Sequence, residues 1–139
     1  MKGRVVGPLQ DDDFERLLAF RDGLRRFQHW SEDQAKAVGL TGAQHQLLLA
    51  IRGHGEIPSI RDVADHLLLR HHSVVELVDR AVAAGLVERV ADADDQRIVR
   101  LRLTATGAER VEALAGAHLE ELSRLRSRFD SLWIDLPGN

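Results

Sequence analysis

The sequence predicts a mainly α-helical protein with one small β-hairpin, and three features support this fold class. Several runs of ten or more residues repeat apolar side chains at helical spacing. Two short β-rich runs, 86–90 and 98–103, flank a charged seven-residue loop. A helix is expected before them, over about 71–84. It is followed by Gly85, a residue that readily takes the left-handed conformation that ends many helices. A helix, a stop and a hairpin in this order are typical of a winged helix-turn-helix, here with long helices at both ends of the chain.

The first half of the chain is expected to form three helices. Three consecutive aspartates suit the positive end of a helix dipole, and apolar side chains at helical spacing follow, so the first helix is expected over about 12–36. Thr41 can cap a second helix over 42–52. Ser59 and Asp62 have the spacing of a capping box, which predicts the start of a third helix.

The fourth helix, over 71–84, has two different faces at helical periodicity. The face expected in the core consists of Val74, Leu77, Val78 and Ala81. The opposite face consists of His71, His72, Ser73, Val75, Glu76, Asp79 and Arg80. On periodicity alone this is equally well an ordinary amphipathic helix with a solvated face. The hairpin that follows it favours a DNA-reading helix instead.

The last helix, which Thr104 can cap, carries a heptad pattern that could pack on a partner helix. Apolar positions recur at alternating intervals of four and three residues. The seam consists of Val111, Ala115, His118, Leu122, Leu125, Phe129 and Leu132. Within the seam, His118 is expected to be either a buried polar specificity element or a pH-responsive contact.

Composition narrows the class of protein. A chain of 139 residues is long enough for a single domain with its own core, and we expect one domain over 1–139. The absence of Cys excludes disulfides, thiol nucleophiles and thiolate metal sites. No apolar run has transmembrane length and no signal-peptide pattern occurs, so we expect a cytoplasmic protein that does not bind membranes. No phosphate loop or catalytic constellation is present, so neither an enzyme nor a cofactor is expected.

The charge balance does not decide whether the chain binds nucleic acid. A net charge of −3 argues mildly against it, because nucleic-acid-binding domains are often basic. All but two of the 19 basic residues, Lys2 and Lys36, are arginines. Arginine is the side chain best suited to bidentate contacts with phosphates and guanine edges.

The chain resembles the MarR family of bacterial transcription regulators over about residues 40–110. The most specific stretches are VDRAVAAGLVER (78–89), DADDQR (92–97) and RLRLTATG (100–107), which look like the end of the recognition helix, the wing tip and the strand-to-helix junction. The resemblance implies a winged-helix DNA-binding core over 40–104. It also implies dimerisation helices over 1–39 and 105–139.

The wing motif departs from the family pattern at two positions. The family usually has Asp-Pro-x-Asp-Arg-Arg, whereas Ala93 and Gln96 stand here in place of the proline and the first arginine. By the resemblance, Asp95 braces the wing and Arg97 enters the minor groove or contacts phosphate. Alternatively, Arg97 and Asp95 form a pair that only stabilises the turn. Arg89 is expected to be a partner of the wing acids or a phosphate contact.

Recognition helices read bases mainly through their N-terminal turns, which makes four side chains of the fourth helix the expected neighbours of bases. Serine and histidine can hydrogen-bond base edges, valine can contact a thymine methyl group, and glutamate can accept from cytosine N4. These four residues are His72, Ser73, Val75 and Glu76. The full set of expected DNA contacts consists of Ser59, Arg70, His71, His72, Ser73, Val75, Glu76, Arg80, Asp95, Gln96 and Arg97.

Other histidines raise the questions of an effector and of a metal. His45 lies where the family usually has a buried aromatic residue, and with Phe27, His29 and Trp30 it could line a cleft for a small aromatic or carboxylate effector. The alternative is a core histidine with aromatic packing neighbours. No specific metal site is expected, because His66, His71 and His72 straddle a turn and no pair has i,i+4 spacing with a third ligand nearby.

These expectations combine into one function. A homodimer formed through the first and last helices would bind a pseudo-palindromic operator with half-sites about 10 base pairs apart. The dimer would repress transcription by occluding a promoter. A ligand that favours another spacing of its two DNA-binding cores would release it from the operator. The alternatives are a metal-responsive regulator and a winged-helix module for protein–protein contact. The net negative charge, together with Glu76, Asp79 and Gln96, favours the protein–protein module.

Overall fold

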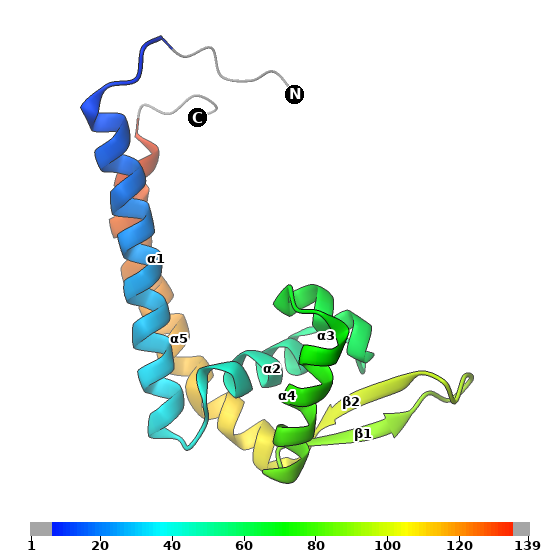
Figure 1. The fold of residues 1–139 in the computed structure, drawn as a ribbon. Helices are drawn as coiled ribbons and strands as arrows, with labels where there is room; N and C mark the ends of the chain where they lie inside the picture. Colours follow the sequence, from blue (N-terminus) through cyan, green and yellow to red (C-terminus); the bar gives the residue numbers. More distant parts are fainter. Residues whose placement is uncertain (1–6, 135–139) are drawn as a thin grey trace. The chain divides into compact units, whose positions relative to one another are not determined.

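A computed structural model of the chain describes residues 7–134, and the ends of the two expected dimerisation segments, 1–6 and 135–139, lie outside the described part. Helices and strands follow in the expected order (Figure 1). The elements are α1 (Asp11–Ala37), α2 (Gly42–Gly53), α3 (Ile60–Leu67), α4 (His71–Ala83), β1 (Val87–Ala91), β2 (Val99–Leu103), α5 (Ala105–Asp130) and the short 3-10 helix η1 (Ser131–Trp133). The predicted fold class, mainly helical with one hairpin, is therefore confirmed.

The predicted caps form because each depends on residues only a few positions apart. The Thr41 side chain accepts the Gln44 N–H at 3.0 Å, and the Gln44 side chain accepts the Thr41 N–H at 3.0 Å. Ser59 and Asp62 exchange the same pair of bonds at the start of α3. Gly85 has a φ of 73°, the left-handed conformation expected after α4.

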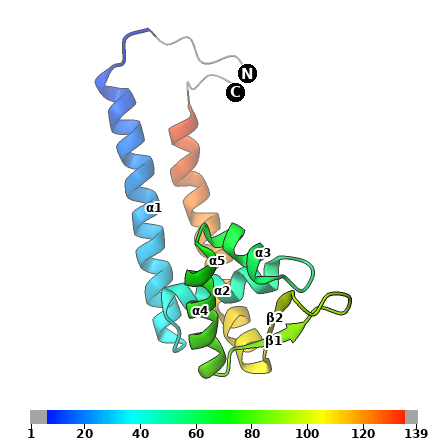
Figure 2. The ribbon, with the colours of Figure 1, turned by 45° about the vertical axis from the view of Figure 1, so that its right-hand side comes forward.

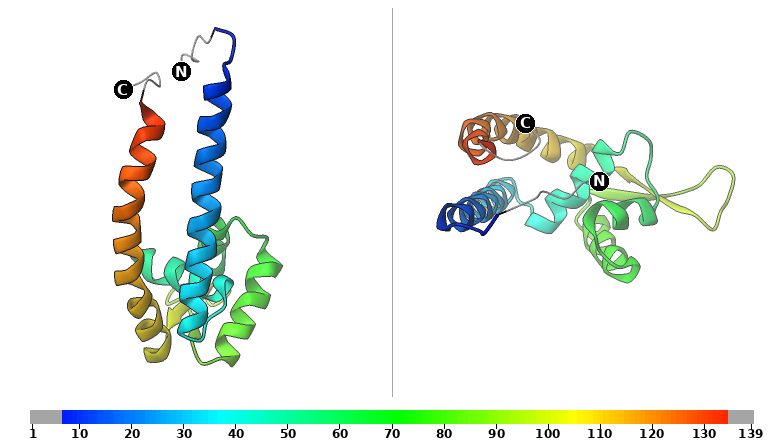
Figure 3. Two further views of the ribbon diagram at one scale, coloured as in Figure 1. Left: turned by 90° about the vertical axis from the view of Figure 1, so that its left-hand side faces the viewer. Right: turned by 90° about the horizontal axis from the view of Figure 1, so that it is seen from above.

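The chain divides into two compact units, and α1 and α5 contribute to both. The first unit ends at Ser31 and resumes at Ala117. In its described part, the outer halves of α1 and α5 run antiparallel beside each other (Figure 3). Aromatic contacts link them, since the ring of Phe20 lies 5.7 Å from that of Phe129 and 6.1 Å from that of Trp133, measured between centroids.

The expected heptad seam of α5 is only partly the buried face of the single chain. Val111 and Leu125 are buried, but Leu122 is 53% exposed, and Leu114, outside the seam, is buried instead. Within its own chain, α5 buries the side chains that face other parts of the chain, and Leu122 stays accessible to a partner helix. Packing of the seam on a partner helix remains a prediction. Ala115 is exposed and Leu132 belongs to η1.

His118 is half-buried in the single chain, so both roles expected for it in a helix seam remain predictions. Its Nε2 lies 2.8 Å from the Ser31 hydroxyl oxygen. Its ring centroid lies 4.8 Å from that of Trp30, and the Phe27 ring meets it edge-on at 6.1 Å. The imidazole therefore joins α5 to α1 through one polar and two aromatic contacts within the first unit.

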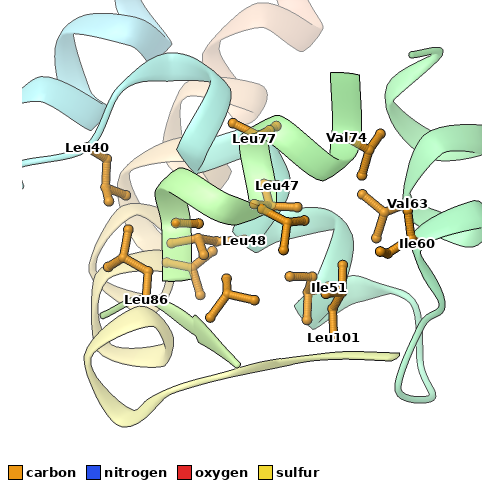
Figure 4. Packing of buried hydrophobic residues seen from close by; sticks show 14 of the residues in the cluster. Leu40, Leu47, Leu48, Ile51, Ile60, Val63, Val74, Leu77, Leu86 and Leu101 are labelled. Atoms are coloured by element: carbon orange, nitrogen blue, oxygen red, sulfur yellow. The ribbon is translucent and has the colours of Figure 1, made fainter. Parts of the chain in front are cut away.

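The second unit, Glu32–Gly116, holds α2, α3, α4 and the hairpin around one apolar core (Figure 4). Leu47 and Leu48 of α2 and Leu101 of β2 are fully buried in it. The predicted core face of α4, which consists of Val74, Leu77, Val78 and Ala81, is confirmed as buried. Because one face of α4 is fixed in the core, the opposite face is presented to solvent.

The hairpin is antiparallel, with Val87 opposite Leu103 and Ala91 opposite Val99. It is also joined to the segment before α3, because the Leu101 N–H donates to the Pro58 carbonyl at 2.8 Å. Beyond its paired strands the loop extends past the helices of this unit (Figures 1 and 2). Among residues 7–134, no helix combines the length and apolar character needed to cross a membrane.

The turn between α3 and α4 contains a strained leucine. Leu68 has a φ of 55° and a 91% exposed side chain. A residue with a Cβ costs about 1–2 kcal/mol in this left-handed conformation, and an exposed side chain recovers little of it. Leu68→Gly is therefore expected to raise the free energy of unfolding by about 1 kcal/mol, measured by urea denaturation.

The neighbouring residue provides the control for this substitution. Leu69 is 42% exposed and does not have a positive φ. Leu69→Gly is therefore expected to lower the free energy of unfolding, because glycine adds backbone entropy to the unfolded chain without relieving strain. Equal losses in the two variants would contradict the assignment of strain to Leu68.

Candidate nucleic-acid interface

The N-terminal turn of α4 carries polar side chains that reach solvent. His71 and His72 are exposed and Ser73 is half-buried. Arg70, the N-cap residue, is exposed and has extended backbone angles, and its side chain makes no capping hydrogen bond. The turn therefore presents polar side chains capable of hydrogen bonding at the positive end of the helix.

Further along α4, two predicted base contacts have additional neighbours. Val75 is half-buried and packs against the core, so only part of its side chain is accessible. Glu76 is exposed, and its carboxylate lies 3.9 Å from the Arg80 guanidinium. Asp79 pairs with Arg89 of β1. Both acids on the exposed face thus have an arginine partner, which reduces their repulsion of an anionic ligand.

The pairing of Arg89 corrects one expectation. Arg89 contacts Asp79 of α4 rather than an acid of the wing loop. The side chain therefore joins β1 to the reading helix. Sequence spacing suggested a wing partner because Asp92 is only three residues away, but alternate residues of a strand face opposite sides.

The wing loop is organised by two carboxylates. Asp92 accepts the backbone N–H groups of Asp94 at 3.1 Å and of Asp95 at 2.9 Å. Asp95 in turn accepts the Arg97 backbone N–H at 3.0 Å. Each carboxylate therefore closes a short turn, the usual role of aspartate in loops.

Arg97 stands at the wing tip with a side chain that is 90% exposed. Its Nε and Nη2 both donate to Asp95, each at 3.0 Å, so the pair is bidentate. The Arg97 guanidinium and backbone N–H hold the pKa of Asp95 below its usual value, and the carboxylate raises the pKa of Arg97. A guanidinium has five N–H donors, so the pair orients Arg97 and still leaves room for another acceptor. Gln96 beside it is exposed.

Arg100 joins the wing to the body of the second unit, a role that the sequence analysis missed. Its Nε donates to Asp92 at 2.5 Å, and its Nη1 donates to the Ile57 carbonyl at 3.0 Å. The Arg100 guanidinium is the main reason that the pKa of Asp92 lies below its usual value. In the sequence, β2 shows only an alternation of apolar and polar residues. That pattern predicts that Arg100 is polar and solvent-facing, but not that it contacts Asp92 and Ile57.

An open hollow of about 490 Å³ separates the start of α4 from the wing. Its lining consists of Ser59, Ile60, Arg61, Asp62, His71, Arg97, Ile98, Val99 and Arg100. Ser59 lines this hollow as expected, although its hydroxyl already accepts the Asp62 N–H. Arg61, which the sequence analysis did not select, adds a cation here. Three arginines and a histidine around one hollow suit a phosphate group.

The four predicted effector residues are divided between the two units. Phe27 and Trp30 lie in the first unit, where their rings are 5.9 Å apart and contact His118. His29 is exposed on α1. His45 is buried in α2, in the second unit, with 6% of its surface exposed. The effector cleft therefore remains a prediction.

A trihelical unit whose last helix is followed by a two-stranded wing defines a winged helix-turn-helix protein. Comparison with known families finds a related group. The model of the MarR family matches residues 38–98, which contain α2, α3, α4 and the wing loop. Residues 38–98 of this chain are therefore similar to the MarR family, the family that the sequence motifs resemble.

Solved structures of this family share the fold. A MarR family transcription regulator is 20% identical, with a TM-score of 0.75 over 88% of this chain and 80% of the other. A mutant E. coli MarR complexed with operator DNA is 20% identical, with a TM-score of 0.66 over 85% of this chain and 86% of the E. coli chain. MepR in the S. aureus MepR–DNA complex is 23% identical, with a TM-score of 0.66 over 78% of this chain and 80% of the MepR chain. A search of curated proteins finds no match.

Proposed function

We propose that this chain is a DNA-binding transcription regulator that reads double-stranded DNA with α4 and the wing. The observation that carries the proposal is the hollow between these two elements. Arg61, His71 and Arg97 surround it, from the start of α3, the start of α4 and the wing tip. A helix in the major groove with a wing on the neighbouring backbone or minor groove would place phosphates between these elements.

The relatives support this proposal. The family model covers α2, α3, α4 and the wing loop, and two structures with the same fold were solved with DNA bound. On this basis Arg70, His71, His72 and Ser73 are the contacts from the first turn of α4, and Arg97 is the contact from the wing. Val75, Glu76 and Arg80 are peripheral contacts because of the core packing and the ion pair described above.

The proposed active form is a homodimer that pairs through α1 and α5. Large apolar side chains are exposed on the outer parts of these helices, including Phe14 at 57%, Leu17 at 63% and Leu119 at 65%. A pocket of about 260 Å³ also opens there among mostly apolar residues, with Phe20 and Trp133 among its walls. Exposed apolar patches of this kind mark protein interaction sites, and a second copy would bury them. Two reading heads would then bind a pseudo-palindromic site with half-sites about 10 base pairs apart.

The finer regulatory proposal is a repressor that a ligand releases. An aromatic or carboxylate effector would act by favouring a dimer in which the spacing of the two heads no longer matches the operator. Phe27, His29, Trp30 and His45 are the proposed contacts. In vitro transcription from a promoter that contains the selected site is expected to fall as protein is added.

The experiment that tests DNA binding is selection on random duplexes, followed by anisotropy titrations of the enriched site at several salt concentrations. We expect a two-fold symmetric motif, two chains per duplex by light scattering, and a steep linear decrease of log affinity with log salt. If no motif is enriched and binding is weak and insensitive to salt, the alternative of a protein–protein interaction module replaces this proposal.

A further inference from the structure

Two histidines that the DNA-binding proposal does not use face each other in the second unit. His54 is the C-cap residue of α2, and His66 lies in the last turn of α3. The Nδ1 of His54 is 2.9 Å from the Nε2 of His66. The two rings meet edge-on, with an interplanar angle of 83° and centroids 5.1 Å apart. Two lone-pair-bearing nitrogens at this distance must share either a proton or a cation.

The carboxylate of Asp62 lies beside the His54 ring nitrogen that does not face His66. Asp62 Oδ2 lies 3.5 Å from the Nε2 of His54. The Ser59 backbone N–H donates to the same oxygen at 2.9 Å, which fixes the carboxylate in this position. A carboxylate oxygen beside Nε2 favours the His54 tautomer that carries its proton on that nitrogen. The Nδ1 lone pair of His54 is then directed at His66.

We propose that His54 Nδ1 and His66 Nε2 bind a divalent transition-metal ion, with Zn²⁺ as the best-fitting class. Tetrahedral Zn²⁺ with Zn–N bonds of 2.0–2.1 Å holds two nitrogens about 3.3 Å apart, so the observed nitrogens need to separate by only a few tenths of an ångström. A carboxylate that accepts the other N–H of a ligating histidine is the usual outer partner of such sites. Asp62 occupies this position toward His54.

The site is open rather than enclosed. The His54 side chain is 27% exposed and His66 is exposed, so an ion can reach both nitrogens from solvent. Among residues 7–134 no group of three or more His, Asp or Glu side chains is arranged to hold a metal, so water completes the coordination. A bound ion would join the end of α2 to the end of α3, the two helices against which α4 packs.

Zinc titration of the whole protein by calorimetry tests this site. We expect one Zn²⁺ per chain in wild type and at least a tenfold weaker affinity in His54→Gln and in His66→Gln. Asp62→Asn is expected to weaken binding by about 10-fold, because its amide oxygen can still accept the Ser59 N–H but no longer carries charge. His71→Gln removes an exposed histidine elsewhere on this unit and is expected to bind zinc like the wild type.

Two further measurements make the outcome decisive. Circular dichroism must show each variant folded, and Co²⁺ in place of zinc must give a d–d absorption band that His66→Gln loses. Unchanged zinc affinity in His54→Gln and His66→Gln would overturn the proposal, as would a loss of affinity caused by His71→Gln. A pair that binds no zinc but titrates as one unit by histidine NMR would also overturn it, since the two nitrogens would then share a proton.

Discussion

Gly107→Ala is expected to lower the free energy of unfolding by about 3 kcal/mol, the largest stability loss that we predict for a single methyl group in this chain. Gly107 is buried in the first turn of α5, and a Cβ built there would lie 2.1 Å from the carbonyl oxygen of Leu86. That oxygen also accepts the Thr104 N–H at 3.0 Å. A backbone atom in a closed hydrogen-bonded junction cannot move aside as the end of a flexible side chain can.

Gly116 in the same helix is the matched control. A Cβ at Gly116 would meet nothing within 4 Å. Gly116→Ala is therefore expected to raise the free energy of unfolding by up to about 1 kcal/mol, the helix-propensity difference between the two residues. Urea denaturation of both variants measures the contrast. If Gly107→Ala were as stable as wild type, the close approach of α5 to Leu86 would be wrong.

Features that depend on residues close together in the chain could be predicted from the sequence. The helix starts at Thr41 and Ser59 and the stop at Gly85 were predictable, because each depends on residues within one turn. The buried face of α4 was predictable for the same reason, since its periodicity is local. The resemblance to the MarR family then identified the wing, because Asp95 and Arg97 retain its spacing.

Features that depend on tertiary contacts were not predictable. Arg100 braces the wing only because the hairpin lies beside the Ile57 carbonyl, 43 positions earlier in the chain. Arg61 enters the candidate interface only because α3 begins beside α4 and the wing. The close approach of Gly107 to Leu86 likewise exists only once the hairpin has formed. The family motif over 100–107 contains both Arg100 and Gly107, but it does not say what either residue contacts.

Arg97→Ala is expected to weaken operator binding about 30-fold, the largest functional loss that we predict for a single side chain. A wing-tip arginine in a narrow minor groove or on phosphate contributes about 1 kcal/mol. The proposed dimer would lose two such contacts, and about 2 kcal/mol corresponds to roughly 30-fold. The slope of log affinity against log salt should become shallower by about 2, since each lost phosphate contact changes it by about 0.9.

Arg102→Ala is the matched control because it removes an arginine from the same hairpin. Arg102 donates to Glu88 at 2.8 Å across the strands and is 54% exposed. It lies within β2, away from the wing tip. Affinity in this variant is expected to change less than threefold. A comparable loss in both variants would mean that general charge, and not the wing tip, determines binding.

Asp95→Asn separates bracing from contact, the two roles open to Arg97. The bidentate pair with Asp95 fixes the guanidinium, so weakening the pair loosens the tip but leaves its charge in place. If Arg97 contacts DNA, Asp95→Asn should lower affinity by only a few-fold and leave the salt slope unchanged. If Arg97 only braces the turn, the two variants should lose affinity equally and neither should alter the slope. The salt slope therefore decides whether Arg97 touches the nucleic acid, which the affinities alone could not.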